Sequence, residues 1–274
     1  MKHEDVAGKE LPIRPYAAGP PWNFRGRALY QLNLVKADVA RKYIPKELKL
    51  VEAFGYTLGG FFLASYDGSP AGAFDEAVII PGIVWNPPSS CAWAGRVLVG
   101  SEEARDHGRK EVGLPSFAAS FSYSARQKDR NGSFPLCTMD GLPANLMASA
   151  KAGEKEQSRL IRTRGPMIRL NLPNFSGQTK EQPNLLKYSC RLSCIASTVK
   201  PVKVIAPLTN EDFTEETEDM LKVMTGKPLV SIFFDSMKMR VEAPVVVDVK
   251  LSDELQQQAK SPSPAPAVPG ASAS

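Results

Sequence analysis

Histidine is nearly absent from this sequence of 274 residues, which contains only two histidines, His3 and His107. A Ser-His-Asp or Cys-His nucleophile uses an imidazole as its base, so this scarcity argues against hydrolases of those kinds. His107 ends a short helical signal that begins at Ser101, where a favourable contact with the helix dipole is enough to explain it. The sequence therefore favours a function that does not depend on histidine chemistry.

Cysteine is also scarce, with four residues in the chain. Four cysteines at this length do not form a disulfide scaffold. The alternating pattern around Cys190 and Cys194 predicts a strand, in which the two thiols lie about 13 Å apart, too far to share a zinc ion. We expect buried thiols here, no metal site and no cofactor.

Long apolar runs and blocks of one charge are missing too. No run reaches the roughly 18 apolar residues that a membrane-spanning helix needs. The net charge of +5 is spread along the chain, which is not typical of a nucleic-acid-binding protein. Residues 1–10 lack the apolar core of a secretory signal and carry acids that transit peptides avoid. The sequence therefore predicts a cytoplasmic protein, with plastid association left open.

Strand-like segments dominate the rest of the sequence, and few helices separate them. The strongest are Gly55 to Tyr66, Glu76 to Trp85 and Leu185 to Thr198, with two shorter strands expected over Leu229 to Phe234 and Met237 to Glu242. The clearest helix is expected over Asp212 to Met224. This order predicts an α+β protein that is mostly β, built as a barrel or sandwich with peripheral helices.

The two ends of the chain differ in composition from the middle. Residues 1–20 are polar with scattered prolines and predict a flexible arm. Residues 21–250 are expected to form a single domain, since no internal repeat or linker divides them. Residues 261–274 consist of Ser, Pro, Ala, Gly and Val and cannot bury a core, so this tail is expected to be disordered.

Glu76 is the titratable residue that the pattern singles out, because it enters an apolar strand. A carboxylate that faces an interior needs a cation or hydrogen-bond donors, or its pKa rises. Arg25 and Arg27 are the expected partners, and the alternative is an ordinary acid at a strand edge. Lys110 is the amine nearest to Ser116; from the residues alone it is a solvated turn lysine, and no base adjoins Ser116 in sequence.

Several segments, in order and over about residues 20–245, resemble the acetoacetate decarboxylase superfamily. They are Ile44 to Leu48, Tyr66 to Glu76, Gly108 to Phe117 and Leu170 to Gly177. Within that superfamily, the runs Val51 to Asp67, Gly82 to Pro88, His107 to Ser116 and Asn184 to Cys190 resemble the plant and algal neoxanthin-deficient family. The resemblance implies a cone-shaped, largely antiparallel β-barrel with an apolar interior and peripheral helices, and a possible homo-oligomer.

The resemblance also implies a site and a departure from it. In the decarboxylases a lysine forms a Schiff base with the substrate, and a neighbouring lysine lowers its pKa. By position the resemblance places the carboxylate at Glu76, the arginine at Arg27, the Gly-Arg motif at Gly108-Arg109 and the Lys-Lys pair at Ser116-Phe117. Serine and phenylalanine cannot form an imine, so that decarboxylation is not expected unless Lys110 or Lys187 supplies the amine.

Two functions remain open from the sequence. The first is an accessory or ligand-binding protein required for neoxanthin biosynthesis, in the branch from violaxanthin toward abscisic acid, which holds a hydrophobic metabolite such as a carotenoid. The second is a lyase or isomerase that acts on a keto or epoxide group, with Glu76 as acid or base. The residues expected to contact the ligand are Glu76, Arg27, Arg109, Ser116 and Phe117, and catalytic candidates are Glu76, Arg27 and Lys110.

Overall fold

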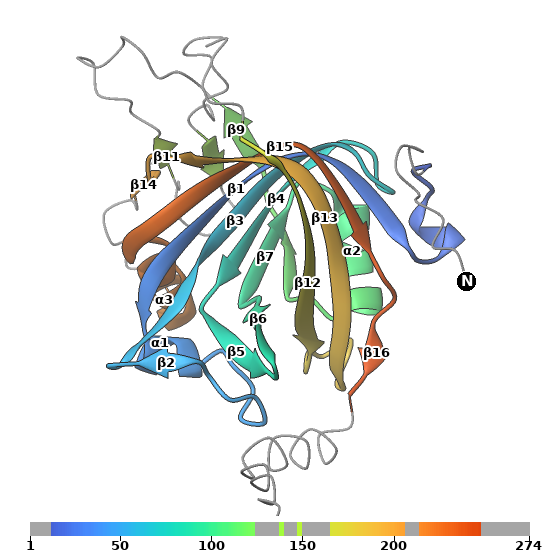
Figure 1. Ribbon diagram of the computed structural model, residues 1–274. Coiled ribbons are helices and arrows are strands. Elements are labelled where there is room, and N and C mark those ends of the chain that lie inside the picture. The colour runs from blue at the N-terminus through green and yellow to red at the C-terminus, as the bar shows by residue number, and fades with distance from the viewer. Residues whose placement is uncertain (1–11, 124–136, 140–146, 150–164, 206–213, 248–274) are drawn as a thin grey trace, which may run out of the picture.

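The computed structural model describes residues 12–123, 137–139, 147–149, 165–205 and 214–247 (Figure 1). The described part is a large mixed β-sheet with a few short helices around it. The expected disordered tail, residues 261–274, and residues 1–11 of the expected arm lie outside the described residues. No described helix has both the length and the apolar composition to cross a membrane.

Ten strands form one hydrogen-bonded path through the large sheet. In path order they are β5 (Gly82–Asn86), β6 (Ser89–Trp93), β12 (Met167–Gly177), β13 (Leu185–Val199), β15 (Lys227–Val241), β1 (Trp22–Lys36), β3 (Tyr56–Gly68), β4 (Phe74–Ile80), β7 (Arg96–Val99) and β8 (Ser116–Ala118). Two further strands lie off this path: β2 (Glu52–Ala53) pairs with β3, and β16 (Val245–Val246) pairs with β13. The expected α+β, mostly β class is confirmed.

The sheet curls but does not close, which corrects the expectation of a complete barrel. Its path ends at β5 and β8, and two of its pairings, β6 with β12 and β7 with β8, are parallel. One bent hairpin connects the two end regions of the path, because only Pro81 separates β4 from β5 and only Ala94 and Gly95 separate β6 from β7. Proline lacks the amide donor that a continuous strand would need at this bend.

The remaining elements cover the sheet. A second, four-stranded sheet has the order β14 (Lys203–Ile205), β11 (Met147–Ser149), β10 (Cys137–Met139) and β9 (Phe121–Tyr123). The helical elements are the 3-10 turn η1 (Tyr16–Ala18), α1 (Ala37–Arg41), α2 (Glu102–His107), the π-helical turn η2 (Gly108–Val112) and α3 (Glu215–Met224). The last of these begins after Thr214, whose side chain accepts a hydrogen bond from the Thr217 amide, three residues later than the sequence predicted.

The central strands bury both faces. In one register row, Leu29, Leu63, Ala77 and Leu98 lie side by side and pack with Met220 and Val223 of α3; we call this side of the sheet the α3 face. In the next row, Ala28, Ala64, Glu76 and Val99 lie side by side on the opposite face of the sheet. Val97 and Val99 pack there in one cluster with Leu192 and Cys194 of β13, five strands along the path. The sheet is therefore concave on this side, which we call the concave face.

Two local expectations need correction. The helical signal expected to end at His107 continues through Gly108, which has φ −54° and ψ −44°, and the left-handed residue that ends the turn is Gly113, with φ 72°. The two strands expected between Leu229 and Glu242 are one strand, β15, bent by a bulge next to Ser236, which has a φ of 50°.

Candidate functional site

Glu76 lies in the middle of the concave face, half-buried, between Ala64 of β3 and Val99 of β7. The Tyr66 hydroxyl donates a 2.8 Å hydrogen bond to Glu76 Oε2, and Tyr66 itself is buried. Among the described residues this is the only side chain that bonds the carboxyl group. Burial raises the pKa of Glu76 to about 7, and the Tyr66 hydrogen bond offsets part of that rise. At neutral pH the group is therefore poised between acid and carboxylate.

Further titratable side chains surround this carboxyl group, and together with it we call them the Glu76 cluster: Glu76, Tyr16, Tyr66, Tyr188 and Cys190. Burial, and next the charge of Glu76, raise the pKa of Tyr66 and of Tyr16. Burial first, with the Glu76 charge as a smaller cause, also raises the pKa of Tyr188, and it raises that of Cys190 to about 12. The tyrosines and the thiol are thus neutral hydrogen-bonding groups around one titrating acid.

The Glu76 cluster adjoins apolar surface that is not fully covered. Leu172 lies opposite Cys190, and Leu170 lies opposite the buried Leu192, in the pairing of β12 with β13. Leu170 and Leu172 are 37% and 40% exposed although they share the concave face with the buried core. Their exposure leaves apolar area beside the polar groups, which is the composition of a site for a mostly hydrophobic ligand.

Three rings stack where the described part of the arm, residues 12–20, meets this site. The Tyr16 ring stacks on His107 at 3.6 Å between centroids, and Trp22 meets His107 edge-on at 4.3 Å. Burial lowers the pKa of His107 to about 4, so the imidazole is neutral. Trp22 Nε1 and His107 Nε2 are buried without a hydrogen-bond partner among the described residues. This part of the arm packs against the domain and leaves two unsatisfied polar atoms next to the Glu76 cluster.

The expected Glu76–Arg27 pair is not on one face of the sheet. Arg27 lies opposite Ser65, which lies opposite Asp75, whereas Glu76 is one residue further along β4. Because successive side chains in a strand point to opposite faces, Arg27 shares a face with Asp75 and is exposed. Arg25 is also exposed, opposite Gly68 near the end of β3. The partner that the structure gives Glu76 is Tyr66 instead.

The η2 turn and β8 bring together Arg109, Ser116 and Phe117, and their contacts have a structural role. Arg109 Nε donates a 2.6 Å hydrogen bond to the Ser116 carbonyl oxygen, and its guanidinium lies 5.2 Å from the centre of the Phe117 ring. Arg96 covers the same ring at 4.5 Å. Ser116 is 1% exposed, and a Cβ added to Gly108 would lie 2.6 Å from its hydroxyl oxygen. The sequence motif is therefore explained by close packing of the η2 turn against β8.

Neither of the two lysines that could have replaced the Schiff-base amine lies beside Glu76. Lys110 is exposed, with its ammonium 3.7 Å from Asp106. Lys187 Nζ donates a 2.8 Å hydrogen bond to Asn86 Oδ1 and lies 5.6 Å from the centre of the Phe175 ring. Phe175 is opposite Lys187 in the β12–β13 pairing, so this lysine points to the face opposite Tyr188. In the part of the chain that the structure describes, Glu76 has no ion-pair partner.

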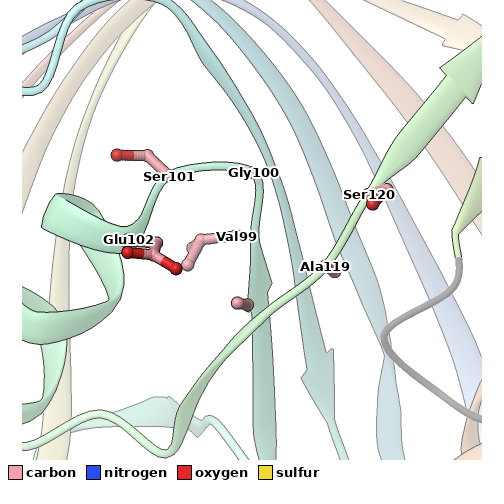
Figure 2. A pocket seen from close by; sticks show the side chains of 7 residues that line it. Val99, Gly100, Ser101, Glu102, Ala119 and Ser120 are labelled. Carbon is pink, nitrogen blue, oxygen red and sulfur yellow. The ribbon is translucent and has the colours of Figure 1, made fainter.

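A pocket of about 390 Å³ opens at the end of β7, beside the strand position that pairs with Glu76 (Figure 2). It is lined by Val99, Gly100, Ser101, Glu102, Ala118, Ala119 and Ser120. Ser101 Oγ already accepts a hydrogen bond from the Ala104 amide as the cap of α2. None of the residues singled out from the sequence lines this pocket, so it is not the predicted site. Across the described ranges, no group of three or more His, Cys, Asp or Glu side chains could hold a metal ion.

Comparison with solved structures identifies the class of fold. The acetoacetate decarboxylase from Legionella pneumophila aligns with a TM-score of 0.56 at 13% identity, covering 90% of this chain and 93% of that one. The enduracididine biosynthesis enzyme MppR, complexed with pyruvate, aligns with a TM-score of 0.55 at 12% identity, covering 89% and 95%. The protein therefore has an acetoacetate decarboxylase-like fold, as the sequence resemblance implied.

Comparison with curated proteins then gives the family. Protein NEOXANTHIN-DEFICIENT 1 of Arabidopsis thaliana is 49% identical over 267 residues, covering 84% of this chain and 94% of the relative. The Solanum lycopersicum protein of the same name is 46% identical over 275 residues, covering 83% and 92%. No family model matches the chain. The chain belongs to the NEOXANTHIN-DEFICIENT 1 family, which confirms the closer of the two sequence resemblances.

Proposed function

We propose that this protein serves neoxanthin biosynthesis by binding an oxygenated, mostly apolar metabolite of the carotenoid class at the Glu76 cluster, without Schiff-base chemistry. The observation that carries the proposal is the Glu76 carboxyl group itself. It is half-buried on a concave apolar face and is bonded only by Tyr66 among the described side chains. The relatives' name supports the pathway, and the sequence resemblance to the decarboxylases implies a carboxylate at Glu76.

The chemistry of the site fits hydroxyl, epoxide or carbonyl oxygens on a hydrophobic molecule. A carboxyl group with a pKa of about 7 donates a hydrogen bond when protonated and accepts one when ionised, so it serves either kind of oxygen. The exposed area of Leu170 and Leu172 offers the apolar contact. Trp22 Nε1 and His107 Nε2 add polar atoms whose bonding capacity is unused in the described structure.

Among the residues that the structure describes, neither Lys110 nor Lys187 lies beside Glu76, which supports the exclusion of a Schiff base. The positions that correspond to the lysine pair hold Ser116 and Phe117, and Ser116 is packed against Gly108. Incubation with keto acids and aldehydes, borohydride reduction and intact mass measurement tests this directly. We expect no adduct, and a stoichiometric adduct mapped to Lys110 or Lys187 would overturn this part of the proposal.

Ligand binding is tested with xanthophylls in dilute detergent, by fluorescence quenching and by the absorbance shift of the polyene. We expect Glu76→Gln to weaken binding about 5- to 20-fold, the range for one lost hydrogen bond to a titratable group. Glu102→Gln, an exposed carboxylate on α2, is the matched control and should bind as the natural protein does. Equal affinity of all three proteins would contradict the proposal.

An isomerase or lyase is the second candidate, and the pKa of Glu76 favours it. A carboxylic acid near its pKa at neutral pH can protonate an epoxide oxygen as the carbon–oxygen bond breaks, and its carboxylate can then take a proton from a neighbouring carbon. Such a step rearranges the substrate without another reactant. Incubation with violaxanthin and product analysis decides between the candidates: turnover that Glu76→Gln abolishes while binding persists would establish the enzyme. A homo-oligomer is a further proposal, tested by light scattering.

A further inference from the structure

The tip of the β2–β3 hairpin displays an aromatic side chain in an unusual way. Phe54 and Gly55 form the turn, with φ values of 53° and 78°, and Ala53 pairs with Tyr56 across it. Two successive positive φ values define a type I′ turn, whose first position is dominated by Asn, Asp and Gly. Phe54 occupies that position at 101% of its reference exposed area. Neither the backbone nor the core of the domain benefits from a phenylalanine here.

A groove with a basic rim adjoins this tip. Its volume is about 740 Å³, and its lining residues are Leu34, Val35, Lys36, Asp38, Val39, Lys42, Tyr56, Asp219, Lys222, Thr225, Gly226 and Lys227. Four lysines against two aspartates give the lining a formal charge of +2. The three aliphatic residues and Tyr56 supply apolar area between the charges.

The positive charge of the groove is carried by two of its four lysines. The ammonium groups of Lys42 and Lys222 lie 2.8 and 2.9 Å from the carboxylate of the buried Asp219. Lys42 also pairs with Glu215 at 2.6 Å and Lys222 with Glu218 at 3.9 Å, so acidic side chains balance the charge of both lysines. Lys36 and Lys227 are exposed, and neither has an ion-pair partner among the described residues. The groove is therefore electropositive at its β1 and β15 edge.

The tip and the groove form one continuous surface. Lys36 lies directly opposite Tyr56 in the pairing of β1 with β3, and Lys227 lies opposite Leu34. The Gly55 carbonyl oxygen accepts a 2.9 Å hydrogen bond from the Ala37 amide, which holds the turn against α1. Figure 1 shows β2 beside α1 at the same end of the sheet as α3. A flat surface that contacts the Phe54 ring therefore also lies next to Lys36.

We propose that the Phe54 tip and the lysine edge of this groove dock the protein on an anionic membrane surface. Aromatic rings concentrate at the membrane–water interface, and lysines near an anionic bilayer add electrostatic attraction. Stable anchoring at a membrane surface takes two signals together, and here an aromatic ring and lysines are present on one surface. A single ring projecting from a narrow turn suits insertion between lipid headgroups, whereas a protein partner would need a broader apolar patch. This inference goes beyond the proposed function, because it does not involve Glu76.

The experiment is co-sedimentation of the full chain with phosphatidylcholine vesicles, with and without phosphatidylglycerol. We expect binding to the vesicles that contain phosphatidylglycerol, and about tenfold weaker binding when salt is raised enough to screen the lysines. Equal binding to neutral and anionic vesicles, or no binding to either, would overturn the proposal.

Two pairs of variants locate the surface. Phe54→Asn removes the ring but suits a positive φ, so the domain stays folded while vesicle binding falls about tenfold. Phe54→Trp keeps an interfacial aromatic and should bind as the natural protein does. For charge, Lys36→Glu should weaken binding about tenfold, and Lys180→Glu, an equal change at an exposed lysine in the β12–β13 turn, should not.

Self-association is the competing outcome and is measured in the same samples. If the natural chain forms a dimer that Phe54→Asn dissolves, the tip is an interface between copies and the membrane proposal is wrong. Xanthophyll binding in detergent should be unchanged in Phe54→Asn, because the Glu76 cluster is on another part of the sheet. A failure of membrane docking is thereby distinguished from a failure of ligand binding.

Discussion

Two polar clusters lie on opposite faces of the same sheet, and they differ in how completely their groups are bonded. On the α3 face, Gln31, Asn33 and Ser231 are buried, at 2%, 0% and 1% exposure, and every side-chain amide has partners. On the concave face, Glu76 has one hydrogen bond, from Tyr66. The first cluster uses its bonding capacity to hold the fold, whereas the second leaves bonding capacity of Glu76 unused among the described residues.

The α3-face cluster shows what a purely structural polar group looks like. Gln31 Oε1 accepts hydrogen bonds from the Val202 amide at 2.7 Å and from the Ser231 hydroxyl at 2.8 Å, while its Nε2 donates to the Val202 carbonyl oxygen at 3.2 Å. The Gln31 side chain thereby bonds both backbone groups of Val202 and fixes the segment before β14 to β1. Buried polar groups that are fully satisfied in this way stabilise and orient a fold.

The strongest test of this contrast is Asn33→Leu, on the satisfied side. Asn33 Nδ2 donates to the carbonyl oxygens of Val223 and Met224, at 3.0 and 2.9 Å, and these close the end of α3. Leucine leaves both acceptors buried and unbonded, so we expect the free energy of unfolding to fall by about 2–4 kcal/mol. Urea unfolding measures it, and Asn171→Leu, at an exposed position of β12, should change it by less than about 0.5 kcal/mol.

The next largest effect belongs to the unsatisfied side and depends on pH. Burial raises the pKa of Glu76 from 4.5 to about 7, so its contribution to stability is fully present below pH 4.5 and is lost as the pH rises through 7. Glu76→Gln removes this dependence. We expect the natural protein to lose on the order of 2–3 kcal/mol relative to the variant between pH 4.5 and 8.

Urea unfolding of both proteins at several pH values gives this difference directly, because all other titrating groups cancel. Glu102→Gln is the control, and its difference from the natural protein should be flat over the same range. A flat difference for Glu76→Gln as well would mean that Glu76 titrates as it does in water, and the contrast between the two clusters would fail.

A smaller effect, about 1 kcal/mol, is expected for Ser231→Ala. This substitution removes one of the two donors to Gln31 Oε1, and the Val202 amide still bonds the same oxygen at 2.7 Å. The loss is therefore milder than at Asn33, where two acceptors lose their only side-chain donor. Thermal unfolding resolves a change of this size, with Ser90→Ala, an exposed serine of β6, as the neutral comparison. A loss of unfolding free energy as large as that of Asn33→Leu would show that the remaining donor to Gln31 Oε1 does not reduce the effect.

The sequence could predict which residues share a face within one strand, since that needs only the period of two. Cys190 and Cys194 were expected in one alternating strand, and the structure places both on the same side of β13. The same local reasoning identified Glu76 as the acid that enters an apolar strand. Both conclusions rest on neighbours in the chain and on nothing further away.

The sequence could not predict which strands meet or in which register. A shift of one residue moves a side chain to the other face, and Arg27 was paired with Glu76 although the register aligns it with Asp75. Tyr66 was missed for the same reason, since its hydroxyl reaches Glu76 across the β3–β4 pairing. An aromatic residue next to a predicted turn, facing the strand of a buried acid, is the signal that would have found it.

The smallest expected effect concerns the one hydrogen bond that Glu76 accepts within the Glu76 cluster. Tyr66→Phe removes the hydroxyl that donates to Glu76 Oε2, and this hydrogen bond is the cause that lowers the pKa of Glu76 against burial. We therefore expect the pKa of Glu76 to rise further above 7, and the pH range over which stability is lost to move upward. The profile of the unfolding free energy against pH measures it, with Tyr56→Phe on the exposed hairpin as the control. An unchanged profile would mean that the hydroxyl bonds the acid and the carboxylate equally well, in which case a ligand oxygen could replace it at no cost to the charge state of Glu76.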